Sequence, residues 1–158
     1  MTKLSLPASD WSIGEGQPLA VIAGLNVLED AGLALEVGRE LANICLDLDL
    51  PYAFKASFDK ANRSSIQSYR GPGLAAGLPM LQQVKADLNV PVCTDIHEVD
   101  QADPVAQIAD ILQIPAFLCR QTDLVVAIAK AASASGGLIQ VKKAQFLAPW
   151  DTANIVRK

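Results

Sequence analysis

From residue 18 onward, short apolar runs alternate with longer segments of helical periodicity, and this alternation restricts the chain to few architectures. It is typical of parallel sheets whose strands are joined by crossover helices. The sequence therefore predicts an α/β fold. Strands are expected at residues 18–26, 51–58, 91–97, 111–116 and 137–144, and helices at residues 30–48, 74–88, 99–109, 122–135 and, as a helix start, 151–158.

The length and composition favour one folded unit. A chain of 158 residues that is 51% hydrophobic can bury a single core, so residues 1–158 are expected to form one domain, with a hairpin within residues 1–17. Charged residues make up 19%, the net charge is −4 and no run of like charge occurs. The composition therefore favours neither disorder nor nucleic-acid binding, and any cluster of positive charge must be local.

The cysteines and the amino terminus indicate the compartment. Cys45, Cys93 and Cys119 lie in apolar surroundings without the spacing of zinc-binding cysteines, so they are expected to be reduced packing residues. The first residues lack the apolar segment of a secretion signal, and no apolar run approaches the roughly 18 residues that a membrane span needs. A cytoplasmic protein without a membrane partner is expected.

Polar side chains recur near the carboxyl ends of the predicted strands. In a β/α barrel or an open parallel sheet these ends form the ligand-binding face, so the side chains are expected to gather on one surface. They are Asn26 at the end of the first strand, Lys55 and Ser57 in the second, Asp95 and His97 in the third, Gln113 in the fourth, and Lys142, Lys143 and Gln145 at the end of the fifth.

The stretch FKASFDKANRSSIQSYRGPG, residues 54–73, adds positive charge to this surface, because its four cations accompany a single acid. A lysine inside an apolar strand costs several kcal/mol, or loses its proton, unless an anion meets it. Ammonium and guanidinium groups match phosphate oxygens, so the pattern predicts a site for one or two phosphates. The cations are Lys55, Lys60, Arg63 and Arg70, the acid is Asp59, and Asn62 and Ser64 are neutral donors beside Arg63.

Ordinary roles stay open for several of these residues. Lys55 could be a strand-edge lysine that extends to solvent along its apolar stem, and Arg63 and Arg70 could be common loop charges. His97, the only histidine, could be a structural group, since a lone imidazole defines neither a metal site nor a catalytic triad. Asn26 is better suited to lining a pocket than to catalysis.

Five strings, FKASFDKANRSS, SYRGPG, TDIHE, QIPAFLCRQTDL and VKKAQF, together resemble the 3-deoxy-D-manno-octulosonate 8-phosphate (KDO8P) synthase family. DAHP synthases and sialic acid synthases match them less well. The resemblance implies a (β/α)8 TIM barrel, of which this chain would contain about the first five strands and four to five helices. It also implies condensation of phosphoenolpyruvate, D-arabinose 5-phosphate and water to KDO 8-phosphate and inorganic phosphate, a step toward lipopolysaccharide.

The resemblance also implies roles for individual residues. Catalytic roles are expected for Lys55, Lys60, Asp95, His97 and Lys142. Substrate binding is expected for Asn62, Arg63, Ser64, Gln113, Ala116, Phe117 and Arg120, and, from their places at the strand ends, for Asn26, Ser57 and Gln145. Family members are usually tetramers, and Phe117 and Arg120 are expected to reach into a neighbouring subunit's site.

Some members of the family bind a divalent metal partly through a cysteine at the end of the first strand. Asn26 occupies the matching position in this chain. An amide is a poor replacement for a thiolate toward a transition metal, so the metal-independent class, with no cofactor, is expected.

The length is shorter than the resemblance requires. A whole barrel takes about 250 residues, and the family's second half contributes further charged residues to the site. The chain is therefore expected to be an incomplete part that is inactive by itself. Two alternatives stay open: a non-catalytic phosphate-ligand or assembly module, and a DAHP-type synthase that uses erythrose 4-phosphate.

Overall fold

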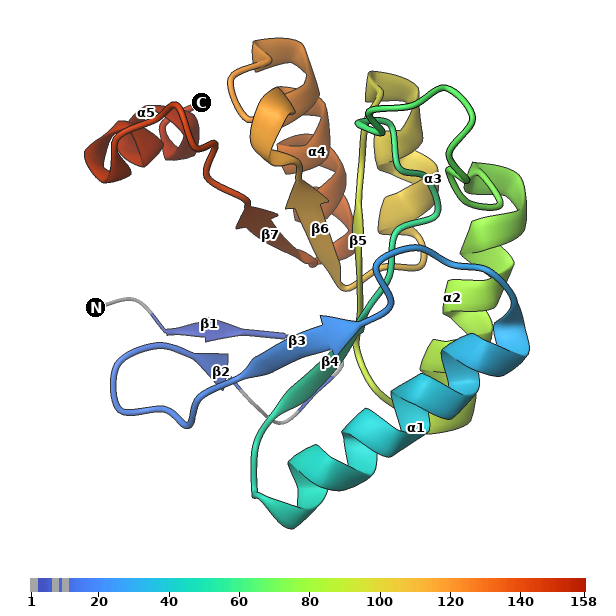
Figure 1. Cartoon of the computed structure of the whole chain (residues 1–158). Helices are drawn as coiled ribbons and strands as arrows, with labels where there is room; N and C mark the ends of the chain where they lie inside the picture. Colours follow the sequence, from blue (N-terminus) through green and yellow to red (C-terminus); the bar gives the residue numbers. More distant parts are fainter. Residues whose placement is uncertain (1–2, 7–8, 10–11) are drawn as a thin grey trace.

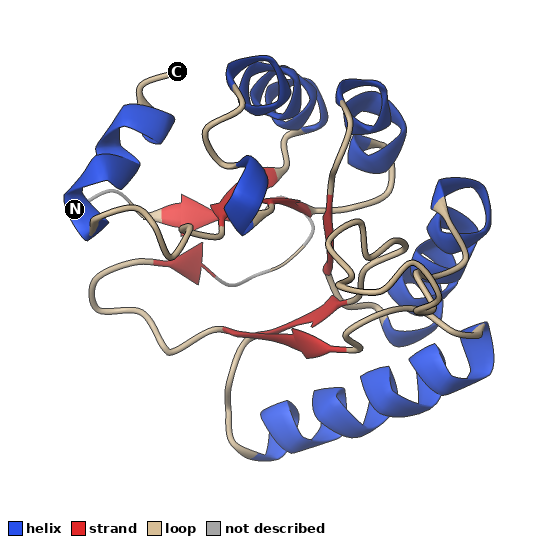
Figure 2. Cartoon of the chain, turned by 45° about the horizontal axis from the view of Figure 1, so that its top comes forward, coloured by secondary structure: helices blue, strands red, loops and turns tan. Residues whose placement is uncertain are grey.

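A computed structural model describes residues 3–6, 9 and 12–158. Its main feature is a five-stranded parallel sheet in which each strand pairs with the next strand along the chain. The sheet curves, and the helices lie along its outer side (Figures 1 and 2). The strands are β3 (Val21–Gly24), β4 (Tyr52–Lys55), β5 (Val92–Asp95), β6 (Ile111–Ile114) and β7 (Leu138–Val141).

Helical segments connect the successive strands, which confirms the α/β prediction. The order of strands and helices is that of part of a β/α barrel, and within the described residues β3 and β7 pair with this sheet on one side only. The helices are α1 (Ala31–Asp47), α2 (Leu74–Leu88), α3 (Ala102–Ala106) after the 3-10 turn η1 (Val99–Gln101), α4 (Thr122–Ser135) after η2 (Ala116–Leu118), and α5 (Thr152–Val156) after η3 (Pro149–Asp151).

Local sequence signals set the ends of the long helices. The Asp30 side chain caps α1 by accepting a 2.9 Å hydrogen bond from the backbone N–H of Leu33. Gly136 ends α4 in the left-handed conformation, with φ of 77°. The strands are shorter than predicted, because the flanking residues leave the sheet to build the connecting loops.

The side chains that face the concave interior of the sheet form two layers, one above the other along the strands. Side chains on successive residues of a strand point to opposite faces, so every second residue faces the interior. Neighbouring strands are staggered between the layers: the register pairs Lys55 of the upper layer with Cys93 of the lower layer, whereas Asp95 and Gln113 pair within the upper layer. The lower layer is apolar and contains Ile22, Ala53, Cys93, Ile111 and Leu138. The upper layer, at the carboxyl ends, contains Gly24, Lys55, Asp95, Gln113 and Gln140.

A short hairpin lies at the amino terminus, beside the sheet (Figure 1). Its strands β1 (Leu4–Ser5) and β2 (Ser12–Ile13) pair antiparallel, and residues 7, 8, 10 and 11 between them lie outside the described part. Leu6 is 2% exposed and packs on the lower apolar layer. The hairpin therefore covers the interior from below and leaves the carboxyl ends of the strands open.

The main core lies between the sheet and its helices. It contains large buried side chains such as Phe54, Phe58, Leu81, Leu112 and Ile128. The three cysteines are free and buried, which confirms their role as packing residues. None of the helices in the described part of the chain has the length and apolar character needed to cross a membrane.

Candidate active site

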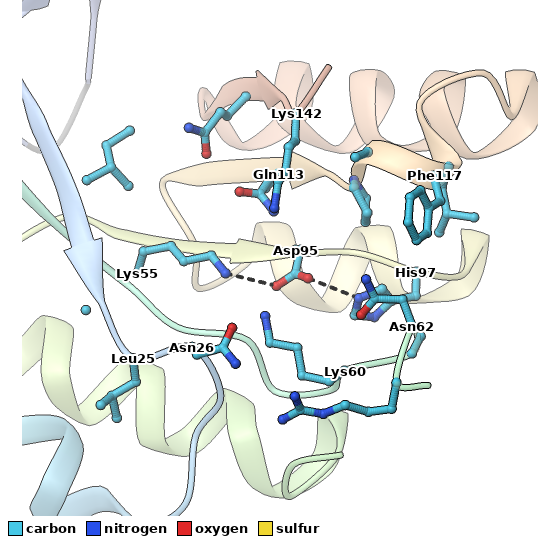
Figure 3. Close-up of a pocket in the computed structure, with 18 of the residues that line it drawn as sticks. Leu25, Asn26, Lys55, Lys60, Asn62, Asp95, His97, Gln113, Phe117 and Lys142 are labelled. Atoms are coloured by element: carbon cyan, nitrogen blue, oxygen red, sulfur yellow. Dashed lines mark hydrogen bonds and ion pairs between the residues drawn. The ribbon is translucent and has the colours of Figure 1, made fainter. Parts of the chain in front are cut away.

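A cavity of about 990 Å³ opens at the carboxyl ends of the five strands (Figure 3). The β3, β4, β5, β6 and β7 strands, or the loops that follow them, all contribute side chains to its wall. The structure therefore brings most of the sequence-predicted site residues together. Those that line the cavity are Asn26, Lys55, Lys60, Asn62, Arg63, Asp95, His97, Gln113, Ala116, Phe117, Lys142 and Gln145.

Three predicted substrate-binding residues do not line this cavity. Ser57 is fully buried, Ser64 is exposed on the loop after β4, and Arg120 is exposed on the segment between η2 and α4. Their expected contacts with substrate stay predictions, and for Ser57 the structure indicates a different position, behind the two lysines of the wall.

Gln140 lines the cavity although the sequence reasoning did not select it. It pairs in register with Gln113 on the neighbouring strand, so the two amides lie side by side at the same level. A usable signal was present, because Gln140 lies two residues before Lys142 and such residues share a face of a strand.

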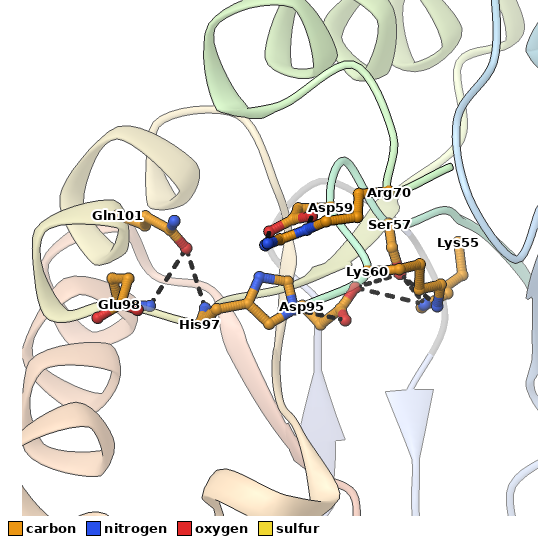
Figure 4. A network of polar contacts seen from close by, with 9 residues as sticks. All are labelled: Lys55, Ser57, Asp59, Lys60, Arg70, Asp95, His97, Glu98 and Gln101. Atoms are coloured by element: carbon orange, nitrogen blue, oxygen red, sulfur yellow. Dashed lines mark hydrogen bonds and ion pairs between the residues drawn. The ribbon is translucent and has the colours of Figure 1, made fainter. Parts of the chain in front are cut away.

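Asp95 is the centre of the polar network in the cavity (Figures 3 and 4). One carboxylate oxygen accepts the Ser57 hydroxyl hydrogen and lies 3.5 Å from Lys55 Nζ, and the other lies 3.1 Å from His97 Nε2. Burial alone would raise the pKa of Asp95, but the hydrogen bond from His97, the charge of Lys55 and the hydrogen bond from Ser57 hold this pKa well below its usual value. Asp95 is therefore a fixed carboxylate.

Lys55 points into this network rather than toward solvent. Its ammonium group donates a 2.8 Å hydrogen bond to Ser57 Oγ and pairs with Asp95. This geometry does not fit the alternative of a strand-edge lysine that extends into water.

His97 combines a structural environment with a place in the cavity wall. Its side chain is 8% exposed, and its ring packs edge-on against Phe58 at a centroid distance of 5.8 Å. The backbone N–H of His97 donates to the side-chain oxygen of Gln101, which holds the start of the loop after β5. Because Nε2 faces the Asp95 carboxylate, the ring orients that carboxylate.

Positive charge is concentrated around Lys60. Burial lowers the pKa of Lys60, the charges of Lys55, Lys142 and Arg63 lower it further, and Asp95 opposes them. Four cations around one cavity repel one another, and a bound anion relieves that repulsion. The wall is therefore suited to phosphate or carboxylate groups.

Two other basic residues turn away from the cavity. Arg70 forms two hydrogen bonds with Asp59, at 2.8 Å and 2.5 Å, which confirms the ordinary loop role for this arginine. Lys143 donates to the backbone carbonyls of Ala144 and Leu147, so its expected place on the ligand face is wrong.

The described residues contain no group of three or more His, Cys, Asp or Glu side chains that could hold a metal ion. Asn26 contributes to the wall of the cavity beside Leu25. The expectation of metal independence rests on this asparagine and stays a prediction.

A parallel α/β sheet with a cavity at the carboxyl ends of its strands has the architecture of small-molecule-binding α/β proteins, and four cations line this cavity. The model of the DAHP synthetase I family matches residues 2–158, and the chain belongs to this family.

Three individual relatives of the chain share one name within this family. The chain is 54% identical over 150 residues to a protein of Desulfotalea psychrophila, covering 95% of this chain and 52% of that protein. It is 51% identical over 158 residues to a protein of Pseudomonas entomophila, covering 100% and 55%, and 55% identical over 149 residues to one of a Cyanothece species, covering 94% and 53%. All three are named 2-dehydro-3-deoxyphosphooctonate aldolase. The chain spans about half the length of the curated relatives it matches.

Proposed function

We propose that this chain supplies the first part of the active site of a 3-deoxy-8-phosphooctulonate synthase. This enzyme condenses phosphoenolpyruvate with D-arabinose 5-phosphate and water to KDO 8-phosphate and inorganic phosphate. The observation that carries the proposal is the convergence of Lys55, Lys60, Arg63 and Lys142 on one cavity. The names of the relatives support the choice of reaction.

In this proposal, phosphoenolpyruvate binds against the wall formed by β4, β6 and β7. Lys55, Lys60 and Lys142 neutralise its carboxylate and phosphate, while Gln113 and Ala116 complete the wall. The C3 carbon of the enol attacks the sugar aldehyde, water adds at C2, and cleavage of the carbon–oxygen bond at C2 expels phosphate. The fixed cations stabilise the negative charge that develops on the reacting groups.

The pentose phosphate binds at the loop after β4. Asn62 and Arg63 line the cavity from this loop, and Ser64 follows directly. The Arg63 Nε donates a 3.0 Å hydrogen bond to the Tyr69 carbonyl, so its two terminal nitrogens stay available for phosphate oxygens. Asp95, held as a carboxylate by its neighbours, accepts hydrogen bonds from sugar hydroxyls.

We also propose that the chain alone does not turn over these substrates. The chain spans about half the length of the relatives, and the family resemblance implies that further charged groups of the site belong to the other half. A site with fewer transition-state contacts loses rate more than affinity for the ground state. Binding of phosphoenolpyruvate without release of phosphate is the expected behaviour.

Calorimetric titration tests the binding proposal. The 158-residue chain is titrated with phosphoenolpyruvate, and D-arabinose 5-phosphate and D-erythrose 4-phosphate are then compared as second ligands. We expect phosphoenolpyruvate to bind and the pentose phosphate to bind more tightly than the tetrose phosphate. Tighter binding of the tetrose phosphate would favour a DAHP-type synthase, and failure to bind phosphoenolpyruvate would contradict the proposal. Phosphate release at an ordinary enzymatic rate would contradict the expected inactivity.

The proposal includes a cytoplasmic homo-oligomer, of the tetrameric kind expected from the family. Phe117 at the cavity rim is 52% exposed, and Arg120 follows it on the same segment. Large exposed aromatic side chains are common at protein interfaces. Sedimentation velocity of the wild type and of Phe117→Ser would check this, since the substitution is expected to weaken assembly.

A further inference from the structure

Ser57 lies between two lysines, Lys55 and Lys60, on one side and the Asp95 carboxylate on the other (Figure 4). Its hydroxyl oxygen accepts hydrogen bonds from Lys55 Nζ at 2.8 Å and from Lys60 Nζ at 2.9 Å. The same hydroxyl donates to Asp95. The residue is 0% exposed, and it does not contribute to the cavity wall.

These three contacts use the whole hydrogen-bonding capacity of the hydroxyl. A serine hydroxyl offers two lone pairs and one hydrogen. The two ammonium groups take the lone pairs, and the Asp95 carboxylate takes the hydrogen. A substrate oxygen would therefore have to displace one of these charged partners to contact Ser57.

The position of Ser57 beside Asp95 follows from the register of β4 and β5. Lys55, the last residue of β4, pairs with Cys93, so Ser57 just after β4 and Asp95 at the end of β5, each two positions further on, lie next to each other. Ser57 and Lys55 point to the same side for the same reason. Lys60 approaches from the loop that follows, and within the described residues Ser57 is the only hydrogen-bond partner of its ammonium group.

We propose that Ser57 is a positioning residue that holds the Lys55 and Lys60 ammonium groups side by side as a ready-made anion receptor and ties this receptor to Asp95. The identity of the anion rests on the proposed function, whereas the arrangement itself does not. The role differs from direct substrate binding, which the sequence predicted for Ser57.

The arrangement has a consequence for the charge of Lys60 in the protein without ligand. A hydrogen bond that a charged group donates favours its charged form. Lys60 faces the cations Lys55, Lys142 and Arg63, which oppose its protonation, and the anion Asp95, which favours it. Removal of the Ser57 hydroxyl takes away an acceptor and leaves this set of charges in place. Lys60 should then lose its proton at a lower pH.

Competitive acetylation measures the pH at which Lys60 loses its proton, and it needs no ligand. The whole chain is labelled with trace acetic anhydride between pH 6 and pH 11, and the modification of each lysine is quantified by mass spectrometry. In Ser57→Ala we expect the labelling of Lys60 to rise at a lower pH than in the wild type. Ser57→Thr keeps the hydroxyl and should follow the wild type. Lys85, which pairs with Asp110 at 2.8 Å outside the cavity, is the internal control and should not change.

An unchanged Lys60 profile in folded Ser57→Ala, or a shift to higher pH, overturns the proposal. An equal shift in Ser57→Thr also overturns it, because packing rather than the hydroxyl would then be responsible. If Ser57→Ala fails to fold, as judged by circular dichroism, Ser57→Cys replaces it. Cysteine has a similar shape but a much weaker acceptor, so the same direction is expected.

Titration with phosphoenolpyruvate separates this proposal from the proposed function. We expect Ser57→Ala to bind about tenfold more weakly than the wild type, a typical effect of losing a hydrogen bond to a charged group, while Ser57→Thr retains most of the affinity. A shifted Lys60 profile without phosphoenolpyruvate binding by the wild type would refute the proposed function and leave the role of Ser57 intact. Equal affinity and equal labelling of Ser57→Ala and the wild type would refute only the role of Ser57.

Discussion

The Tyr69 hydroxyl donates a 3.0 Å hydrogen bond to the backbone carbonyl of Leu28. This contact joins the loop after β4 to the segment between β3 and α1. The carbonyl of the same Tyr69 accepts from Arg63 Nε. Tyr69 thus connects Arg63, which faces the cavity, to the loop after β3. Tyr69 itself belongs to the basic segment of residues 54–73.

Tyr69→Phe removes only this hydroxyl, so it tests whether the contact orients Arg63. We expect a loss of stability of about 1 kcal/mol, the usual net value of one hydrogen bond, in urea unfolding. We also expect weaker binding of D-arabinose 5-phosphate in calorimetry with little change for phosphoenolpyruvate, because Arg63 belongs to the sugar-phosphate side. Tyr52→Phe, which removes a hydroxyl bonded to the Ala23 carbonyl, is the matched control for stability alone. Equal losses for both ligands would contradict the assignment.

Lys142 and Lys143 are adjacent in sequence but have opposite environments. Lys142 lines the cavity, whereas Lys143 donates to the carbonyls of Ala144 and Leu147. We expect Lys142→Met to weaken phosphoenolpyruvate binding at least about tenfold, because a charge-assisted contact is lost. Lys143→Met should keep the affinity and lower the unfolding midpoint instead. The reverse pattern in calorimetry and urea unfolding would show that the lysine contacting the anion is misassigned.

The regular spacing of apolar residues and the glycines at helix ends made the long helices predictable. The predicted segments 74–88 and 122–135 coincide with α2 and α4, because their apolar spacing is regular and a glycine precedes the first and follows the second. The strands were predicted too long, since apolar residues that flank a strand also fill the core beside the loops. Parallel strands bring their carboxyl ends together, so the gathering of Lys55, Asp95 and Lys142 could be predicted as well.

Side-chain direction outside the strands could not be predicted in the same way. Arg70 turns away because the loop conformation brings Asp59 within its reach, and Lys143 turns away because the loop that follows it presents two backbone carbonyls. The burial of Ser57 was likewise hidden, because alternation gives the face of a residue and not its depth. Depth depends on the long Lys55 and Lys60 side chains that fold over the smaller hydroxyl.

Close packing between α2 and the start of the basic loop gives a prediction on stability. A Cβ at Gly77 would lie 2.4 Å from the Phe58 Cβ, closer than two carbon atoms can approach. We expect Gly77→Ala to destabilise the protein by about 1–3 kcal/mol, since either the helix or Phe58 must shift. Urea unfolding measures this. Gly32→Ala, on the exposed side of α1, is the control and should cost less, because a Cβ there would meet only the Asp30 carboxylate, at 3.1 Å. A neutral Gly77→Ala would contradict the packing.

The fixed charge of Asp95 predicts how stability depends on pH. Its folded-state pKa lies below the usual value, so its contribution is complete above the unfolded-state pKa of about 3.9 and is lost as pH falls toward the folded pKa. We therefore expect Asp95→Asn to be less stable than the wild type at pH 7, with a difference that shrinks as the pH falls from about 4 to 2. Urea unfolding across this range gives the free energy of unfolding of both proteins. The other acids titrate in both, so their contributions cancel in the difference between the two free energies. Asp87→Asn, exposed on α2, controls for the loss of one charge. A difference between Asp95→Asn and wild type that stays constant over this range would mean that Asp95 is not held as a carboxylate by Lys55, Ser57 and His97.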